Sequence, residues 1–241
     1  NDVRHPDHRI VEGDKFGYDY ALSENSLSAE FGLRYSMGRL AFSADAAIWR
    51  ERFYRKGFFE KELYAGSRSY GRSEMVNFSP YALRATLSYA IATQHHLELG
   101  LLHSATSPED ENLFLNPQYN NRVADNLMLQ RHSSAEVNYR LSTPAVESSV
   151  TAFASISNDE RQIFRAYDDL SATYCDVDIE GLATLRYGVE TAVKVKLSRN
   201  LSADATLALG RYAYNSNPTV TLYSDIDNSV ISSRSRSYMR G

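Results

Sequence analysis

Residues 27–37 read Leu-Ser-Ala-Glu-Phe-Gly-Leu-Arg-Tyr-Ser-Met, with an apolar side chain at every second position. Side chains of a β-strand point alternately to its two faces, so this stretch predicts a strand with one apolar and one polar face. Gly38-Arg39 follows, and glycine supplies the backbone conformation that a tight hairpin needs. Residues 40–48 alternate in the same way, which predicts a second strand paired with the first.

The same alternation recurs along the rest of the chain, in six further stretches. They lie at about 81–91, 97–101, 135–141, 146–156, 185–197 and 201–209. The connections run short, long, short, long, and the long ones cover about 53–74, 106–126 and 157–181. Short turns at one end and long loops at the other are typical of bacterial outer-membrane barrels. The strands also reach the ~10 residues that a tilted strand needs to cross a bilayer core.

Composition excludes some classes of protein and leaves others open. The hydrophobic fraction of 43% and charged fraction of 23% suit a soluble protein or a transmembrane β-barrel, in which only alternate residues meet lipid. No window approaches the ~20 consecutive apolar residues of a membrane helix, which excludes a helical membrane protein. The net charge of −4 and the lack of a basic patch give no sign of nucleic-acid binding. The 17 tyrosines suit strand ends at a membrane interface, although tyrosine is also a good strand former.

These patterns predict an all-β fold, an antiparallel up-and-down transmembrane β-barrel of about eight or more strands. Residues 1–241 are expected to form part of one barrel domain. Within it, residues 1–24 would be an outer loop or lead-in, 25–214 four β-hairpins, and 215–241 an outer loop or lead-out. Because the first residues are polar and unlike a secretory signal, we expect a mature form or an internal fragment.

Several short motifs, taken in order, resemble segments of TonB-dependent outer-membrane receptors of the Bacteroidota type. They are Glu12-Gly-Asp-Lys-Phe-Gly-Tyr-Asp-Tyr20, Phe78-Ser-Pro-Tyr-Ala-Leu-Arg-Ala85, Leu115-Asn-Pro-Gln-Tyr-Asn-Asn-Arg122 with Asp125-Asn-Leu127, Tyr187-Gly-Val-Glu190, and Gly210-Arg-Tyr-Ala-Tyr-Asn215 with Asn217-Pro218. The chain departs from the family pattern at Gln118, where the usual motif has arginine.

The resemblance implies a partial segment of a larger 22-stranded barrel, filled by an N-terminal plug. Members of this family import siderophores, glycans, peptides or similar nutrients across the bacterial outer membrane, with energy delivered through TonB. The implied partners are outer-membrane lipid, the remainder of the barrel and plug domain, TonB through a part of the protein outside this sequence, and the transported ligand. The chain would then be an uptake protein and not an enzyme.

Aromatic residues in the long connections are the best candidates for ligand binding. They are Tyr64, Tyr70, Tyr119, Tyr167 and Tyr174, which stand among Gly, Asn, Asp and Arg. Aromatic and polar side chains on loops can stack on a ligand and hydrogen-bond it. The alternative is that these rings pack the loops together or sit at the membrane interface.

Signals for catalysis or metal binding are weak. Asp176, Asp178 and Glu180 share a strand face but would stand ~7 Å apart, which makes a poor calcium cage. The single Cys175 excludes an internal disulfide framework. No nucleophile elbow and no phosphate-binding loop are present. We therefore expect no catalytic residue, no metal and no cofactor.

Two other functions remain open on the sequence. One is a complete eight-stranded outer-membrane barrel with a structural or adhesive role, in which the strand at 201–209 would pair with the strand at 27–37. The other is a soluble β-sheet binding domain, in which the apolar row from Leu185 to Leu197 would be buried against another sheet.

Overall fold

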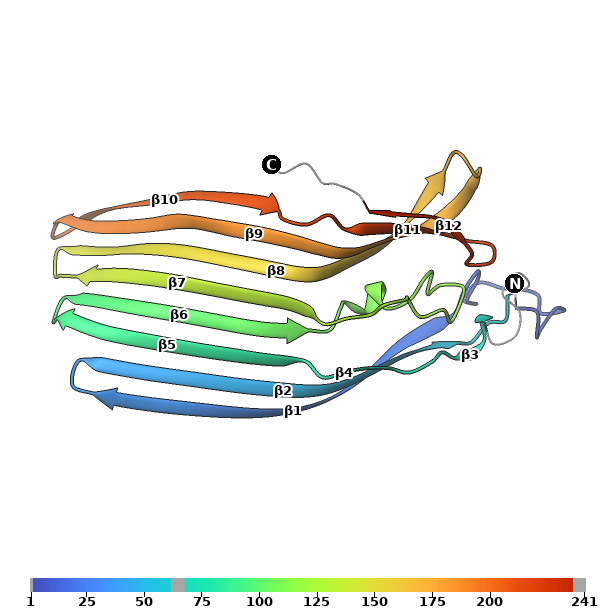
Figure 1. Ribbon diagram of the computed structural model, residues 1–241, viewed down its shortest axis with the longest axis horizontal. Coiled ribbons are helices and arrows are strands. Elements are labelled where there is room, and N and C mark those ends of the chain that lie inside the picture. The colour runs from blue at the N-terminus through green and yellow to red at the C-terminus, as the bar shows by residue number, and fades with distance from the viewer. Residues whose placement is uncertain (1, 62–67, 236–241) are drawn as a thin grey trace.

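A computed structural model describes residues 2–61 and 68–235, and in it the chain forms one twelve-stranded antiparallel sheet (Figure 1). The strands are β1 (Tyr20–Met37), β2 (Leu40–Gly57), β3 (Gly71–Arg72), β4 (Val76–Phe78), β5 (Tyr81–Ala92), β6 (His95–Thr106), β7 (Gln130–Ser142), β8 (Val146–Asp168), β9 (Thr173–Ser198), β10 (Leu201–Tyr214), β11 (Thr219–Ser224) and β12 (Val230–Ser235). A 3₁₀ turn, η2, covers Asp110–Asn112. In the part of the chain that the structure describes, no helix is long and apolar enough to cross a membrane.

The predicted hairpins are confirmed. β1/β2, β5/β6, β7/β8 and β9/β10 are consecutive antiparallel pairs, joined by short turns at one end of the sheet (left in Figure 1). The long connections gather at the other end, which we call the long-loop end. β9 is long enough to pair with two strands on the same edge, β10 near the short turns and β11 near the long-loop end.

The strand register brings the apolar residues of all eight hairpin strands onto one side of the sheet, here called the apolar face. Residues directly opposite one another in an antiparallel pair point to the same face. One row across the sheet runs Tyr35, Phe42, Leu87, Leu99, Val137, Ala152, Val189 and Leu209, each opposite the next.

The other side, the polar face, carries the charged residues and several glycines. Arg34 forms an ion pair with Asp45 across the first hairpin, with 2.7 Å between Nη2 and Oδ1. Phe153 stands on this face against the alternation, and the register places it opposite Gly188. A Cβ on that glycine would lie 3.0 Å from the Phe153 ring, so the ring occupies the space that the missing side chain leaves open.

Between the short turns and the long-loop end, neither face of the hairpin strands is covered by another layer among the described residues. Phe31 is 69% exposed, Leu209 65% and Val189 45%. The accessible surface is 15,570 Å², whereas a compact monomer of 27.2 kDa would expose ~10,900 Å². The apolar row from Leu185 to Leu197 is therefore not buried against a second sheet of this chain.

The buried core lies at the long-loop end. It consists of three clusters: Phe53, Phe78, Leu113 and Phe114; Cys175, Val177, Ile179 and Leu182; and Leu115, Ala124 and Tyr223. The segment 107–129 contributes to two of them and reaches from β2 and β4 across to β11. Phe53 lies on the same side of β2 as Asp45, so this segment covers the polar face at the end of the sheet.

Several predicted boundaries were wrong. β1 begins at Tyr20, inside the predicted lead-in 1–24, and β11 and β12 lie in the predicted loop 215–241. β8 and β9 continue through the predicted loop 157–181 and extend beyond their neighbours in Figure 1. Residues 175–179 are all buried, so both faces of β9 are covered there and the side chains do not alternate. A register shift between β8 and β9 near Asp159, together with the positive φ of Gly181, also interrupts the period of two.

The sheet is not closed within residues 2–61 and 68–235. β1 pairs with β2 alone, and β10 pairs with β9 alone. The pairing of the eighth strand with the first, which a closed eight-stranded barrel requires, is therefore not formed in the described structure.

Gly188 is a position where neighbouring strands approach closely and leave no room for a side chain. The Cβ of Gly188→Ala would meet the Leu209 carbonyl oxygen at 2.4 Å and the Phe153 ring, so we expect a loss of ~1–3 kcal/mol in unfolding free energy. Thermal or urea unfolding followed by circular dichroism measures it. Ala208→Val, at an exposed site on the same face, should stay within ~0.5 kcal/mol. Equal losses in the two variants would contradict the packing of Phe153 on Gly188.

Candidate ligand-binding surface at the long-loop end

Three of the five predicted tyrosines lie together around the guanidinium group of Arg165 on β8. The guanidinium carbon is 5.0 Å from the ring centroid of Tyr174 and 5.9 Å from that of Tyr119. Tyr167 packs edge-on against Tyr174, with 5.3 Å between the ring centroids. We call these four residues the Arg165 cluster. Tyr167 lies on β8, Tyr174 on β9 and Tyr119 in the 107–129 segment. The complete cluster therefore forms only when the long-loop end folds.

The other two predicted tyrosines are not in this cluster. The guanidinium carbon of Arg4 lies over the Tyr70 ring, 3.9 Å from the ring centroid. The backbone carbonyl oxygen of Tyr70 accepts a hydrogen bond from Asn121 Nδ2 at 3.1 Å. Tyr70 therefore helps hold the N-terminal segment and the 107–129 segment. Tyr64 lies outside the described residues.

Arg165 is held in place by a carboxylate that sequence reasoning missed. It forms an ion pair with Asp225 Oδ2, and Asn116 Nδ2 donates to the other carboxylate oxygen, Oδ1, at 2.5 Å. Lys61 adds a second cation near the Tyr119 ring, with Nζ 5.6 Å from its centroid. Asp225 is 60 residues from Arg165 and 109 from Asn116, so no local pattern in the sequence could have linked them.

The chemistry of the Arg165 cluster suits recognition of a ligand. Tyr167 and Tyr174 are 54% and 55% exposed, so their rings and hydroxyl groups are open to stacking and hydrogen bonding. The guanidinium group of Arg165 lies beside the rings, and its ion pair with Asp225 already orients it. The entropic cost of ordering this side chain when a ligand binds is therefore lower. Sugars, peptides and aromatic groups all contact such surfaces well.

Arg55 fixes the segment that carries Tyr119. This side chain is 1% exposed, and its guanidinium group donates to the carbonyl oxygens of Pro117 at 2.5 Å and Ser69 at 2.9 Å, and to Asn121 Oδ1 at 2.5 Å. Burial lowers the pKa of Arg55 to about 10, which still leaves it charged at neutral pH. The end of β2 thus anchors the 107–129 segment through a cation bonded to neutral oxygens.

A second buried arginine ties the same segment to β8 and β9. Arg161 forms a two-point ion pair with Asp178 and donates to the Asp125 carbonyl oxygen at 2.5 Å. The Tyr223 hydroxyl of β11 donates to Asp125 Oδ2 at 3.1 Å, and burial together with that carboxylate raises the pKa of Tyr223 to about 12. Asp178, considered above as a calcium ligand, is therefore engaged by an arginine.

Asp176 lies next to this network and is less well satisfied. It is 2% exposed, and its Oδ2 has no hydrogen-bond partner within the described structure. Burial and the nearby charge of Asp225 raise the pKa of Asp176 to about 6, against a smaller opposing effect of Arg165.

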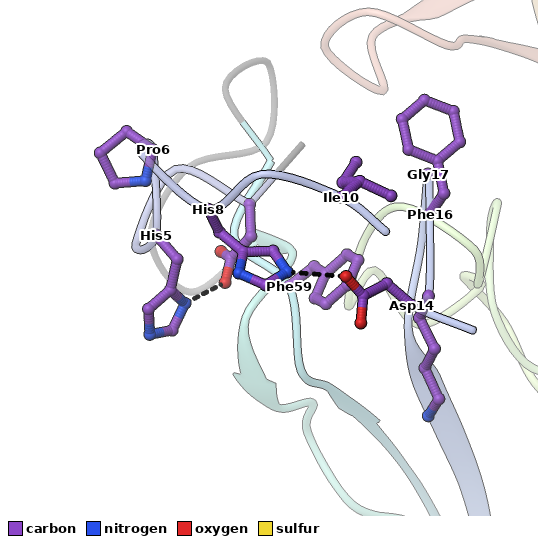
Figure 2. A pocket seen from close by; sticks show the side chains of 10 residues that line it. His5, Pro6, His8, Ile10, Asp14, Phe16, Gly17 and Phe59 are labelled. Carbon is purple, nitrogen blue, oxygen red and sulfur yellow. Dashed lines mark hydrogen bonds and ion pairs between the residues drawn. The ribbon is translucent and has the colours of Figure 1, made fainter. Parts of the chain in front are cut away.

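The long-loop end also has two hollows. An open groove of about 840 Å³ is lined by residues 120–126, by Arg68 and Arg72, and by Asp227 and Asn228. A smaller pocket of about 290 Å³ is formed by the N-terminal segment and Phe59 (Figure 2).

The two histidines of the smaller pocket face carboxylates. His5 Nδ1 lies 2.8 Å from Asp2 Oδ2, and His8 Nε2 lies 3.0 Å from Asp14 Oδ2 (Figure 2). These contacts join residues three and six positions apart, so they hold local turns of the segment. Within residues 2–61 and 68–235 no group of three or more His, Cys, Asp or Glu is arranged to hold a metal ion.

Removing the Arg55 anchor should loosen the 107–129 segment. Arg55→Ala leaves buried carbonyl oxygens without a donor, which costs ~3 kcal/mol. We expect the amides of Leu115 and Ala124, both hydrogen-bonded within this segment, to exchange with solvent about a hundredfold faster. Arg52→Ala, on the opposite and exposed side of β2, should leave their exchange unchanged. Unchanged exchange in Arg55→Ala would contradict the anchoring role.

The raised pKa of Asp176 gives stability a defined pH dependence. The folded state binds the proton more tightly than the unfolded state, where the pKa is 3.8, so stability falls as pH rises from ~4 through ~6. Asp176→Asn removes this titration, and we expect it to stabilise the protein by ~3 kcal/mol at pH 8 and little at pH 4. Thermal unfolding across this range measures it, with the exposed Asp169→Asn as control. Parallel pH profiles for Asp176→Asn and the unsubstituted protein would contradict it.

Comparison of the chain with models of protein families, with curated proteins and with solved structures found no match.

Proposed function

We propose that this chain forms part of the wall of a bacterial outer-membrane β-barrel, a TonB-dependent receptor that takes up a siderophore, glycan or peptide. In this proposal the apolar face contacts lipid, the polar face lines the interior, and the long-loop end faces outward with the Arg165 cluster available to ligand. The observation that carries the proposal is the apolar face itself, continuous across eight strands and uncovered by any described element.

The height of the apolar face fits a bilayer. The apolar row of β1 runs from Leu27 to Met37, ten residue steps that span ~33 Å along the strand. A tilt of ~40° reduces this to ~25 Å along the membrane normal, which matches the lipid-facing band of known barrels.

Tyrosines mark both borders of this band, as the sequence led us to expect. Tyr35, Tyr89 and Tyr139 lie on the apolar face near the short turns, and Tyr81 lies on it at the long-loop end of β5. Tyr187, on the same face of β9, stands opposite Arg211 of β10, and Arg131 stands opposite Ala105, level with Tyr81. No other Asp, Glu, Lys or Arg lies on the apolar face between the level of Tyr81 and the short turns in β1 to β10 as described. A band with interfacial tyrosine and so few charges suits a lipid environment.

The two other functions fit less well. A closed eight-stranded barrel needs β10 to pair with β1, and these strands are unpaired with each other in the described structure. A soluble domain would leave an apolar face far larger than the few hundred Å² that soluble monomers usually expose. The ordered motifs that resemble TonB-dependent receptors support the receptor over other outer-membrane barrels.

Charge placed on the two faces distinguishes lipid from water. Val189→Arg puts a cation on the apolar face and should cost ~2–4 kcal/mol of folding into lipid vesicles. Thr151→Arg adds the same charge on the polar face, opposite Glu190, and should cost little. Folding into vesicles can be followed by the shift in electrophoretic mobility between folded and heated samples.

Similar losses in both variants, or a folded protein that is monomeric and soluble without detergent, would overturn the membrane assignment. The receptor assignment has its own test, in cells. Nutrient uptake that requires both this protein and TonB supports it, and uptake that persists without TonB contradicts it.

A further inference from the structure

β2 continues past the lipid-facing band with a row of cations on the same side. Even-numbered residues of this strand occupy the apolar face up to Ile48, and beyond it they are Arg50, Arg52, Tyr54 and Lys56. Burial follows this alternation, because Phe53, Arg55 and Gly57 are buried whereas the three cations are exposed. The cations therefore point away from the 107–129 segment, in the direction of the surrounding lipid in the proposed placement.

Neighbouring strands add one more cation and no acid to this surface. Arg72 of β3 pairs with Lys56, and its guanidinium carbon lies 4.3 Å from the Tyr54 ring centroid. Arg52 stands between Asn25 on β1 and Asn77 on β4. We call Arg50, Arg52, Lys56 and Arg72 the β2 cation row.

The row differs from four other arginines at the long-loop end, which are paired with carboxylates. Arg122, Arg131, Arg161 and Arg165 form ion pairs with Asp125, Asp159, Asp178 and Asp225. No member of the β2 cation row forms an ion pair with any described residue; Arg50 only donates to Ser79 Oγ, at 3.3 Å. The nearest acids on these strands, Glu24 and Glu51, lie on the opposite face. Arg50 and Arg52 stand ~7 Å apart on the strand, and Lys56 stands opposite Arg72. These unneutralised cations repel one another, and an external anion would relieve that repulsion.

The length of the β2 cation row indicates which kind of anion could contact all of it. From Arg50 to Lys56 the strand advances six residue steps, ~20 Å along its axis and ~15 Å along the membrane normal at a ~40° tilt. The headgroup layer of a phospholipid leaflet is only ~5–8 Å thick. A single glycerophosphate would therefore reach Arg50 and Arg52 but not Lys56 or Arg72.

We propose that the β2 cation row binds the headgroup of an outer-leaflet glycolipid whose phosphates are spread over several sugar units. The inference rests on the proposed function, since it requires that the apolar face lie in a membrane. Guanidinium groups pair with phosphate oxygens through parallel hydrogen bonds. Asn25, Asn77 and Ser23 stand among the cations with donors and acceptors suited to sugar hydroxyls.

The test uses the protein reconstituted into phosphatidylcholine nanodiscs and titrated with fluorescent lipopolysaccharide that carries phosphorylated core sugars, or with phosphatidylglycerol. We expect preferential binding of lipopolysaccharide. Each cation near a charged membrane surface contributes about fivefold to binding, so Arg52→Gln with Lys56→Gln should weaken it about 25-fold. Arg84→Gln with Lys194→Gln removes the same charge from the polar face and serves as the matched control.

Equal binding of phosphatidylglycerol, full competition by inorganic phosphate, or equal weakening in the control pair would overturn the glycolipid site. So would binding of the soluble core polysaccharide as tight as that of the intact lipid, which would indicate a soluble acidic partner. Failure of the unsubstituted protein to enter the nanodisc would instead overturn the proposed function, and the mobility shift on heating reports this separately for every variant.

Discussion

Everything in this structure depends on the cross-strand register that keeps eight apolar rows on one side of the sheet. Backbone hydrogen bonds set that register, and a slip of one residue in any strand would turn its apolar side chains to the polar face. Tight turns, such as the one at Gly38, where φ is +60°, fix the register from the short-turn end. The apolar face is thus a product of backbone pairing and needs no packed layer over it, which is why the membrane can be its proposed partner.

The long-loop end follows a different principle. It holds the buried core, and buried arginines organise it: Arg55 binds neutral oxygens of two segments, and Arg161 joins Asp178 to the Asp125 carbonyl. These bonds hold the 107–129 segment against the extended β8–β9 hairpin. The rings around Arg165 are therefore carried by segments whose relative positions are fixed. In the proposed function the sheet lies in the membrane and the long-loop end presents a structured surface for the ligand, as an uptake protein requires.

The sequence predicted the sheet well and its long-loop end poorly, for physical reasons. Strict alternation from Leu27 to Met37 reports a strand with two different environments, and the structure has that strand and its hairpin partner. Where β9 is buried on both faces, at 175–179, the alternation vanishes and the strand was taken for a loop. Tyr119, Tyr167 and Tyr174 could be proposed from composition, but Arg165 and Asp225 could not, because their contacts join segments far apart in the chain.

The central claim is that the two faces of the sheet meet different environments, lipid on one side and water on the other. The most direct measurement places single spin labels at successive positions 184–197 of β9, in a variant with Cys175 replaced by Ser, and compares collisions with oxygen dissolved in lipid and with a water-soluble paramagnetic reagent. If the apolar face lies in lipid, accessibility has a period of two, with odd-numbered positions such as Val189 reached from lipid and even-numbered positions such as Glu190 reached from water. Equal access of the water-soluble reagent to both sets would contradict it.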